Sequence, residues 1–248
     1  MYQTKKQEPI KIDHLNRFPN ETCVMPFFQP VVHIHSGHLF GITAWFSGYR
    51  QAGLEKKTDL FETAWKNGIQ HQVDLCLRQN VFTDFFRFRQ HNPCKLFLRL
   101  DHRACRSPDY FPGHTLELLT RQGLTPADVC FELSAHCGAE KDRHLFEISD
   151  RYRFQGFQTM LTNFDIRSCG LDYLDRLTPD YIRIDRSLFS NMKQHPEKKQ
   201  ILSFLITYSH LKECRVLACD GRNKEEFTAC REMGCDLVQG NLVQPPQQ

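Results

Sequence analysis

Short apolar runs alternate with longer amphipathic segments along most of this 248-residue chain. The runs at 129–133 and 181–184 are rich in β-branched and aromatic residues, which is typical of buried strands. Between such runs lie segments with apolar residues at helical spacing, for example 69–89. The alternation of strands and helices predicts a parallel sheet covered by outer helices.

The first two apolar runs, 24–34 and 38–45, are separated only by His35-Ser36-Gly37 and predict a β-hairpin. Further strands are predicted at 96–100, 129–133, 157–161, 181–184, 215–219 and 237–238, and helices at 60–68, 69–89, 108–122, 140–154, 169–177, 188–211 and 224–233. Residues 157–184 form one strand-helix-strand unit, and chemistry in such folds sits at the carboxyl ends of the strands. Those ends are Thr162-Asn163 and Ile184-Asp185.

Six sequence blocks carry a family resemblance. They are Phe28-Gln29-Pro30, Gly41-Ile42-Thr43-Ala44-Trp45, Val129-Cys130-Phe131-Glu132-Leu133, Leu161-Thr162-Asn163-Phe164, Ile182-Arg183-Ile184-Asp185-Arg186-Ser187 and Gly234-Cys235-Asp236-Leu237-Val238-Gln239-Gly240. In this order and near this spacing, the chain resembles the EAL domain, the family of bacterial cyclic di-GMP phosphodiesterases, over roughly 24–246. The resemblance implies an α/β fold, namely a TIM-like (β/α)8 barrel of EAL type with an antiparallel first strand pair and a shortened C-terminus. We expect a polar leader at 1–22 and a single barrel domain at 23–248.

Composition narrows the function classes. The 32 basic and 29 acidic residues leave a net charge of +3, which does not support direct nucleic-acid binding. The start lacks a signal-peptide core, and no apolar stretch is long enough to span a membrane, so we predict a soluble cytoplasmic protein. The eleven cysteines include no C-x-x-C pair, and we expect reduced thiols that act as small core residues.

The resemblance implies a site for two divalent cations, held in the family by carboxylates and an amide at the strand ends. The family's ligand positions fall here on Thr43, Arg99, Glu132, Thr162, Asn163 and Cys219. Only Glu132 is a carboxylate, and one carboxylate among neutral and cationic groups cannot hold two divalent cations. We therefore predict no metal and no other cofactor.

Other functional positions of the family are also replaced. The lysine beside the attacking water falls on Arg183, which stays protonated, a later glutamate falls on Arg222, and a phosphate-binding arginine falls on Ser47. The positions that still match the family are Gln29, Glu132, Asp185 and Gln239. These residues are the expected remnant of the family site.

Two interpretations of the arginines remain open. Arg99 can form a bridge to Glu132 on the neighbouring strand, which would fill the vacated site as a structural plug. Alternatively, Arg99 and Arg183 form an anion site that still attracts a phosphate.

Three other motifs are weaker candidates. The histidines His33, His35 and His38 could suggest zinc, but side chains alternate in direction on a hairpin. The adjacent pair His136-Cys137 resembles a nucleophile with its base, but nothing identifies a third group to orient it. The tripeptide Asp220-Gly221-Arg222 reads as a turn.

The sequence predicts a non-catalytic EAL-like regulatory protein that acts through a protein partner. As the resemblance implies, stand-alone degenerate members bind transcription regulators, such as the flagellar master regulator, so the expected partner is a transcription regulator controlling motility, fimbriae or biofilm. The first alternative is a cyclic di-GMP receptor without hydrolysis, and the second is a slow phosphodiesterase. We expect cyclic di-GMP binding to be weak or absent, and a homodimer is left open.

The end of the chain gives one further expectation. Family domains continue into a helix that packs over the last strand, whereas this sequence stops at Gln248. We expect a bare apolar flank on the last strand, covered by residues 9–18 of the leader or by a second protein.

Overall fold

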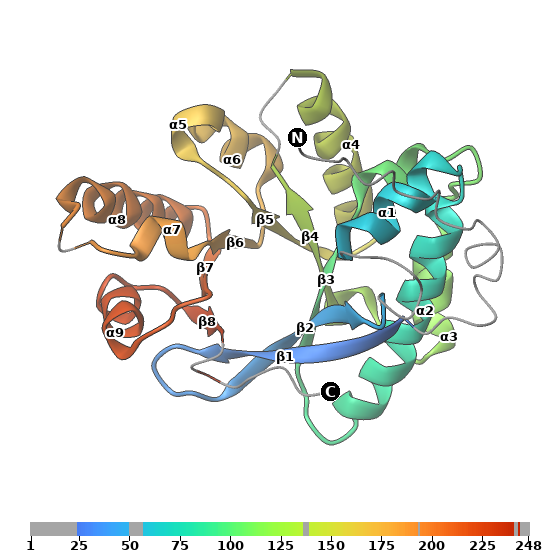
Figure 1. Cartoon of the computed structure of the whole chain (residues 1–248), viewed down its shortest axis with the longest axis horizontal. Coiled ribbons are helices and arrows are strands. Elements are labelled where there is room, and N and C mark those ends of the chain that lie inside the picture. The colour runs from blue at the N-terminus through green and yellow to red at the C-terminus, as the bar shows by residue number, and fades with distance from the viewer. Residues whose placement is uncertain (1–23, 50–56, 136–138, 193, 241–242, 244–248) are drawn as a thin grey trace, which may run out of the picture.

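The computed structural model describes residues 24–49, 57–135, 139–192, 194–240 and 243. Within these residues, eight strands close into a barrel in chain order (Figure 1). The strands are β1 (Met25–His33), β2 (Leu39–Ser47), β3 (Lys95–Arg99), β4 (Val129–Ser134), β5 (Gln158–Thr162), β6 (Tyr181–Ile184), β7 (Arg215–Cys219) and β8 (Leu237–Gln239). The predicted (β/α)8 barrel is therefore confirmed.

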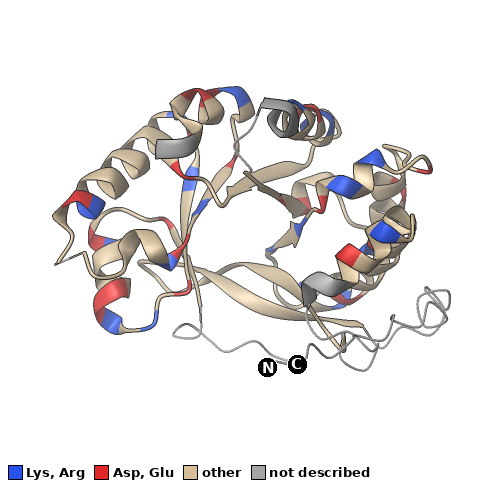
Figure 2. Ribbon diagram, turned by 45° about the horizontal axis from the view of Figure 1, so that its top comes forward, with Lys and Arg blue, Asp and Glu red and all other residues tan. Residues whose placement is uncertain are grey.

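Helices cover the outside of the ring of strands (Figure 2). They are α1 (Lys57–Lys66), α2 (Gln70–Arg89), α3 (His114–Arg121), α4 (Ala139–Phe154), α5 (Ile166–Cys169), α6 (Leu171–Leu177), α7 (Arg186–Phe189), α8 (Pro196–Leu211) and α9 (Lys224–Glu232), with short 3₁₀ helices η2 (His102–Arg106) and η3 (Pro126–Asp128). In the described part of the chain, no helix combines the length and apolar character needed to cross a membrane. The predicted leader at 1–22 lies outside the described residues.

The strand directions place the carboxyl ends of the parallel strands at one mouth of the barrel. Strand β1 is antiparallel to both β2 and β8, whereas β2 to β8 run parallel to one another. The predicted hairpin forms, and Gly37 follows its turn with φ +71°, a conformation that costs glycine little. Because the seven parallel strands end together, their last residues surround one opening.

Two apolar clusters hold the barrel together. The barrel interior contains Val31, Phe97, Cys130, Met160, Tyr181, Leu217, Cys219 and Leu237, all buried. The larger cluster lies between the strands and the outer helices and includes Phe82, Phe85 and Phe131. Successive strand side chains point to opposite faces, so each central strand contributes to both clusters.

The predicted helix at 108–122 is too long at its start. The chain instead forms η2, an irregular connection, and then α3 from His114 to Arg121. Pro108 and Pro112 lie in the connection, and a residue that precedes proline is disfavoured in helical conformation. The two prolines therefore explain why the helix begins only at His114.

The predicted helix at 188–211 is also wrong as a single element. It is divided into α7 and α8, with Asn191 at φ +56° between them. Pro196 occupies the first turn of α8, where its missing N–H has no partner to lose. The same proline inside a longer helix would clash with the preceding turn.

A buried polar network joins α2 to α3 and α4. The Arg78 guanidinium pairs with Asp74 at 2.6 Å and donates hydrogen bonds to Thr115 Oγ1 and, at 2.8 Å, to Tyr152 Oη. The guanidinium also lies 5.1 Å from the centre of the Phe131 ring on β4. Arg78 is 3% exposed, so this network holds three outer helices and one strand in register away from water.

The cysteine prediction is confirmed for most described residues and wrong for one. The free thiols are Cys76, Cys94, Cys105, Cys130, Cys214, Cys219, Cys230 and Cys235. Cys169 at the end of α5, in contrast, is disulfide-bonded. A disulfide depends on the distance between two Cβ atoms in the folded chain, which cysteine spacing in the sequence does not give.

Candidate functional site

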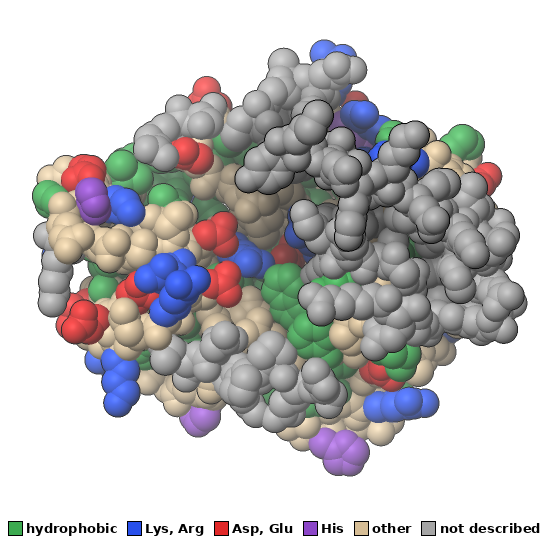
Figure 3. All heavy atoms as spheres, in the orientation of Figure 1, with side chains coloured by type: hydrophobic (Ala, Val, Ile, Leu, Met, Phe, Trp, Pro, Cys, Tyr) green, Lys and Arg blue, Asp and Glu red, His purple; other side chains and the backbone are tan. Residues whose placement is uncertain are grey.

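The expected remnant site lies at the mouth of the barrel, which we define by side chains of the parallel strands. Arg99, Thr162, Cys219 and Gln239 end their strands, Glu132 and Arg183 lie among the last three residues of β4 and β6, and Thr43 lies within β2. Gln29 on β1 pairs in register with Thr43 and is 7% exposed. Thr43, Glu132 and Gln239 are also buried. The fold thus brings the predicted remnant residues to one end of the barrel, and Figure 3 shows basic and acidic side chains mixed near the middle of one face.

Arg183 is the central charged group of this site. Its guanidinium lies 3.5 Å from Glu132, 3.3 Å from Asp185 and 3.8 Å from Asp220, measured between nitrogen and oxygen atoms. Only 13% of the Arg183 side chain is exposed. Burial opposes its charge, but the surrounding groups, including Cys219 and the three carboxylates, outweigh burial and raise the pKa of the guanidinium. A permanent positive charge therefore occupies the centre of the mouth.

The predicted bridge between Arg99 and Glu132 is wrong. Arg99 and Glu132 are neighbours in strand register, but the Arg99 residue is exposed and no ion pair joins it to any residue in the described ranges. Glu132 pairs instead with Arg183, which reaches it from β6. Arg99 ends its strand at the rim, where its side chain can extend into water and avoid the cost of burial.

The other predicted ligand positions carry neutral groups that bond to their neighbours. Thr162 Oγ1 donates to the Leu133 carbonyl at 3.4 Å, and Asn163 Nδ2 donates to Ser134 Oγ at 2.8 Å. The Cys219 thiol donates to Gln239 Oε1 at 3.5 Å. These contacts tie adjacent strand ends together.

The side chains at the mouth do not fit a pair of divalent cations. Magnesium and manganese need several oxygen ligands with negative charge, and Glu132, Asp185 and Asp220 all lie within 3.8 Å of the Arg183 guanidinium, whose positive charge repels a cation. No group of three or more His, Cys, Asp or Glu side chains in the described ranges is arranged to hold a metal ion. That statement includes His33, His35 and His38.

Cys219 is expected to resist alkylation in the folded protein at pH 8. Burial raises the pKa of its thiol, Arg183 acts in the opposite direction, and the net shift is upward. The residue is 0% exposed. Peptide mass spectrometry after brief iodoacetamide treatment should show less than about one tenth of the modification found after urea denaturation, because only the exposed thiolate reacts. Equal modification in both samples would place this thiol in solvent.

Sequence reasoning missed Asp220. The sequence indicated only that Asp220 belongs to a turn. In the structure it follows β7 directly with φ +64°, and its carboxylate lies near the Arg183 guanidinium. Its position at the carboxyl end of a parallel strand was the signal that could have identified it. Arg222 in the same tripeptide is exposed, and its backbone N–H donates to Glu226, which also holds Arg186.

Ser47 and the pair His136-Cys137 were also singled out in the sequence. Ser47 ends β2, and its hydroxyl donates to the Met25 carbonyl at 3.4 Å across the hairpin. The pair His136-Cys137 lies outside the described residues. Ser47 therefore supports the β1–β2 pairing and brings no charge to the mouth.

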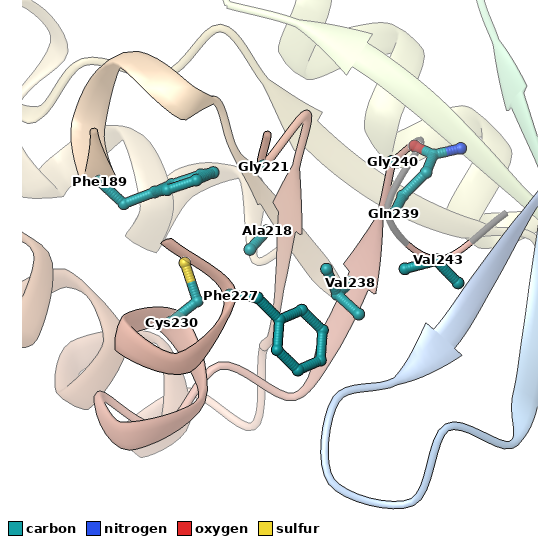
Figure 4. A pocket seen from close by; sticks show the side chains of 9 residues that line it. All are labelled: Phe189, Ala218, Gly221, Phe227, Cys230, Val238, Gln239, Gly240 and Val243. Atoms are coloured by element: carbon teal, nitrogen blue, oxygen red, sulfur yellow. The ribbon is translucent and has the colours of Figure 1, made fainter. Parts of the chain in front are cut away.

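The flank of the last strand is not bare. An apolar depression there is bordered by Phe189 of α7, Phe227 and Cys230 of α9, and Val238 and Val243 (Figure 4). Phe189, Cys230 and Val238 are nevertheless buried, which contradicts the expected exposed patch. The short helix α7, which sequence reasoning merged with α8, brings Phe189 against this flank. Residues 9–18, proposed as a cover, lie outside the described residues.

Comparison with known proteins gives a family match. The model of the EAL domain matches residues 14–246. A protein of Azorhizobium caulinodans, described as uncharacterized, is 27% identical over 87% of this chain and 30% of its own length. The probable cyclic di-GMP phosphodiesterase PdeG of Escherichia coli K12 is 23% identical over 99% of this chain and 48% of its own length. The chain thus spans less than half of either relative.

Solved structures share the fold. The EAL domain of FimX from Pseudomonas aeruginosa bound to c-di-GMP has a TM-score of 0.80 at 18% identity, covering 95% of this chain and 96% of that one. The PaMucR phosphodiesterase in its c-di-GMP complex has a TM-score of 0.81 at 17% identity, with the same coverages. At this identity, the similarity establishes the barrel architecture alone.

Proposed function

Because this chain belongs to the EAL domain family, we propose that it is a regulatory protein which has lost cyclic di-GMP phosphodiesterase activity and acts by binding a protein partner. The family's signalling context suggests a transcription regulator controlling motility, fimbriae or biofilm as that partner. The single observation that carries the proposal is the Arg183 guanidinium among Glu132, Asp185 and Asp220.

The position of Arg183 argues against hydrolysis. A metal pair supplies a nucleophilic hydroxide and neutralises charge on a phosphate during displacement. Arg183 supplies positive charge, but it cannot generate hydroxide, and it stays protonated at neutral pH. It also engages Glu132, the one family ligand that is still a carboxylate. These features of the described residues support the proposed loss of hydrolysis.

The same arrangement weakens dinucleotide binding. Three carboxylates surround Arg183, so its charge is largely balanced before any phosphate arrives. Ser47 stands where the family uses a phosphate-binding arginine, and each lost charge-assisted contact costs about 1.5 to 3 kcal/mol. That loss corresponds to roughly one to two decades in affinity.

The surface of α8 supports a protein partner. Phe204 is 51% exposed and Leu211 is 76% exposed, and their spacing of seven residues places them on one helix face. The Tyr208 ring stacks on Phe204 between them, with ring centres 6.1 Å apart. Contiguous apolar side chains on a surface are typical of protein interaction sites.

The purified protein is expected not to hydrolyse cyclic di-GMP with excess magnesium or manganese, because the carboxylates at the mouth surround Arg183 and no group of side chains in the described ranges is arranged to hold a metal ion. Chromatography of the nucleotide products measures this directly. Thr43→Glu alone should remain inactive, since it restores one ligand of several. Metal-dependent turnover above the buffer background that Glu132→Gln abolishes would contradict the proposal.

The partner is tested by capture from the native host with the full chain as bait. We expect a regulatory protein to be retained by the wild type and lost with the double substitution Phe204→Ser and Leu211→Ser. The matched control is Phe154→Ser, because Phe154 is 92% exposed but lies at the end of α4. If both variants keep the captured protein, α8 is not the docking surface.

The second candidate function is a cyclic di-GMP receptor without hydrolysis. It is favoured by the c-di-GMP complexes of the structural relatives and by the retention of Gln29, Glu132, Asp185 and Gln239. Calorimetry that shows sub-micromolar binding, removed by Arg183→Ala, would replace the partner proposal with this one.

A further inference from the structure

Two histidines outside the mouth form a direct contact between outer elements of the barrel. His71 lies in the first turn of α2, and His114 is the first residue of α3. His71 Nε2 and His114 Nδ1 are 3.2 Å apart, and the ring planes differ by 19°. With ring centres 5.4 Å apart, the nitrogen atoms rather than the ring faces make the closest approach. The geometry is that of one hydrogen bond between two imidazole rings.

The number of protons on the pair decides how stable this contact is. Two neutral imidazoles carry one N–H each, so one nitrogen can donate across the contact and the other can accept. His71 is 3% exposed, and its Nδ1 has no hydrogen-bond partner among the described residues. When neutral His71 carries its proton on Nε2, its Nδ1 holds only a lone pair and has no N–H that would need an acceptor. This is the least costly arrangement of a buried imidazole.

An added proton removes that arrangement. A proton on His114 Nδ1 faces His71 Nε2–H, unless the His71 hydrogen moves to Nδ1, where no described residue accepts it. A proton on His71 itself also leaves the buried Nδ1–H without an acceptor. A buried donor without a partner carries its full desolvation penalty. The contact is therefore most stable while both rings are neutral: one added proton keeps the N–H···N bond but leaves the buried Nδ1–H of His71 unsatisfied within the described part of the chain, and a second proton sets two N–H groups against each other.

Charged and titratable groups surround the pair on every packed element. Arg78 and Asp74 belong to α2, Asp109 and Tyr110 precede α3, and Cys105 belongs to η2. Arg151 of α4 lies over the Tyr110 ring at 5.5 Å, and Tyr152 of α4 bonds to Arg78.

The surrounding groups favour the neutral pair. Burial comes first among the causes that lower the pKa of His71, followed by His114 and Arg78, and Asp109 opposes them weakly. A lowered histidine pKa means that the stabilisation is complete above the ordinary value of about 6.5 and is lost as the pH falls below it.

We propose that His71 and His114 form an acid-sensitive latch that holds the segment 107–118, which contains the η2–α3 connection and the start of α3, against α2. The segment packs on the pair through its own side chains. The Tyr110 ring meets His71 edge to face at 5.4 Å, and the Phe111 ring lies 5.2 Å from that of His114. Protonation weakens the contact, because it leaves the buried His71 Nδ1–H without an acceptor among the described residues, and so loosens this segment. The Arg78 to Thr115 hydrogen bond, which no histidine titrates, keeps the rest of α3 in place.

Hydrogen exchange of the full chain tests the latch at pH 7.5 and pH 5.0, after correction for the intrinsic exchange rate. We expect protection of amides in 107–118 to fall at least about threefold at pH 5.0, because the buried pair disfavours the added proton, with α8 unchanged. His71→Gln should remove the pH dependence. A glutamine can donate to neutral His114 and accept from protonated His114, so it satisfies both states.

The matched control is His91→Gln, because His91 is an exposed histidine just after α2. This variant should keep the wild-type response. Equal pH dependence in wild type and His71→Gln, or no local change in wild type, overturns the latch. If His71→Gln fails to fold, His114→Gln and an NMR titration of the wild-type imidazoles decide the matter. An NMR titration in which His71 gains its proton above pH 6.5 also overturns it.

Discussion

Replacing Arg183 with methionine is expected to lower the free energy of unfolding by about 3 kcal/mol, because the buried Glu132 carboxylate then loses the guanidinium beside it. Only 5% of the Glu132 side chain is exposed, so water cannot replace the guanidinium. Asp185 and Asp220 are more exposed and contribute less to the loss. Urea denaturation at pH 7 followed by circular dichroism measures the change.

A double substitution separates the ion pair from the packing of Arg183. Glu132→Gln combined with Arg183→Met removes both charges and should recover most of the stability lost in Arg183→Met. Arg222→Met is the matched control, since Arg222 is exposed near the same mouth, and it should change stability by less than about 0.5 kcal/mol. If Arg183→Met and Arg222→Met are equally stable, Arg183 is not the charge that fills the site.

Replacing Arg78 with methionine is expected to cost about 4 kcal/mol, the larger of the two effects. Arg78 is 3% exposed, and its loss leaves Asp74 buried without its partner at 2.6 Å. The hydroxyls of Thr115 and Tyr152 lose a donor at the same time. The free energy of unfolding from urea titration measures the effect, and exchange at α3 should rise because its tie to α2 is removed.

Arg176→Met provides the control for Arg78→Met. Arg176 pairs with Asp150 at 2.8 Å, but both side chains are more than half exposed. Such a surface pair contributes little, because water screens both charges. Asp74→Leu together with Arg78→Met should be more stable than Arg78→Met, because no buried charge remains. A loss for Arg78→Met as small as that for Arg176→Met would show that the network is dispensable.

The sequence by itself determined the barrel and the residue types that stand near its strand ends. Apolar runs alternate with amphipathic segments because each strand buries both faces and each helix buries one. The order of polar and apolar residues within each segment therefore indicates the type of element. The residues at the strand ends could likewise be identified, because the carboxyl end of a parallel strand is fixed once the strand is found. Arg99 and Thr162 end β3 and β5, and Cys219 and Gln239 end β7 and β8.

Only the tertiary structure decided how the side chains at those ends pair. Arg99 and Arg183 were both candidates to neutralise Glu132, and the choice depends on which side chain crosses the mouth and which can reach water. Asp220 joins the site through a left-handed backbone conformation that no spacing rule predicts. His71 and His114 meet although 43 residues separate them. Such contacts follow from helix packing around the closed barrel, because packing brings together residues that local periodicity treats as independent.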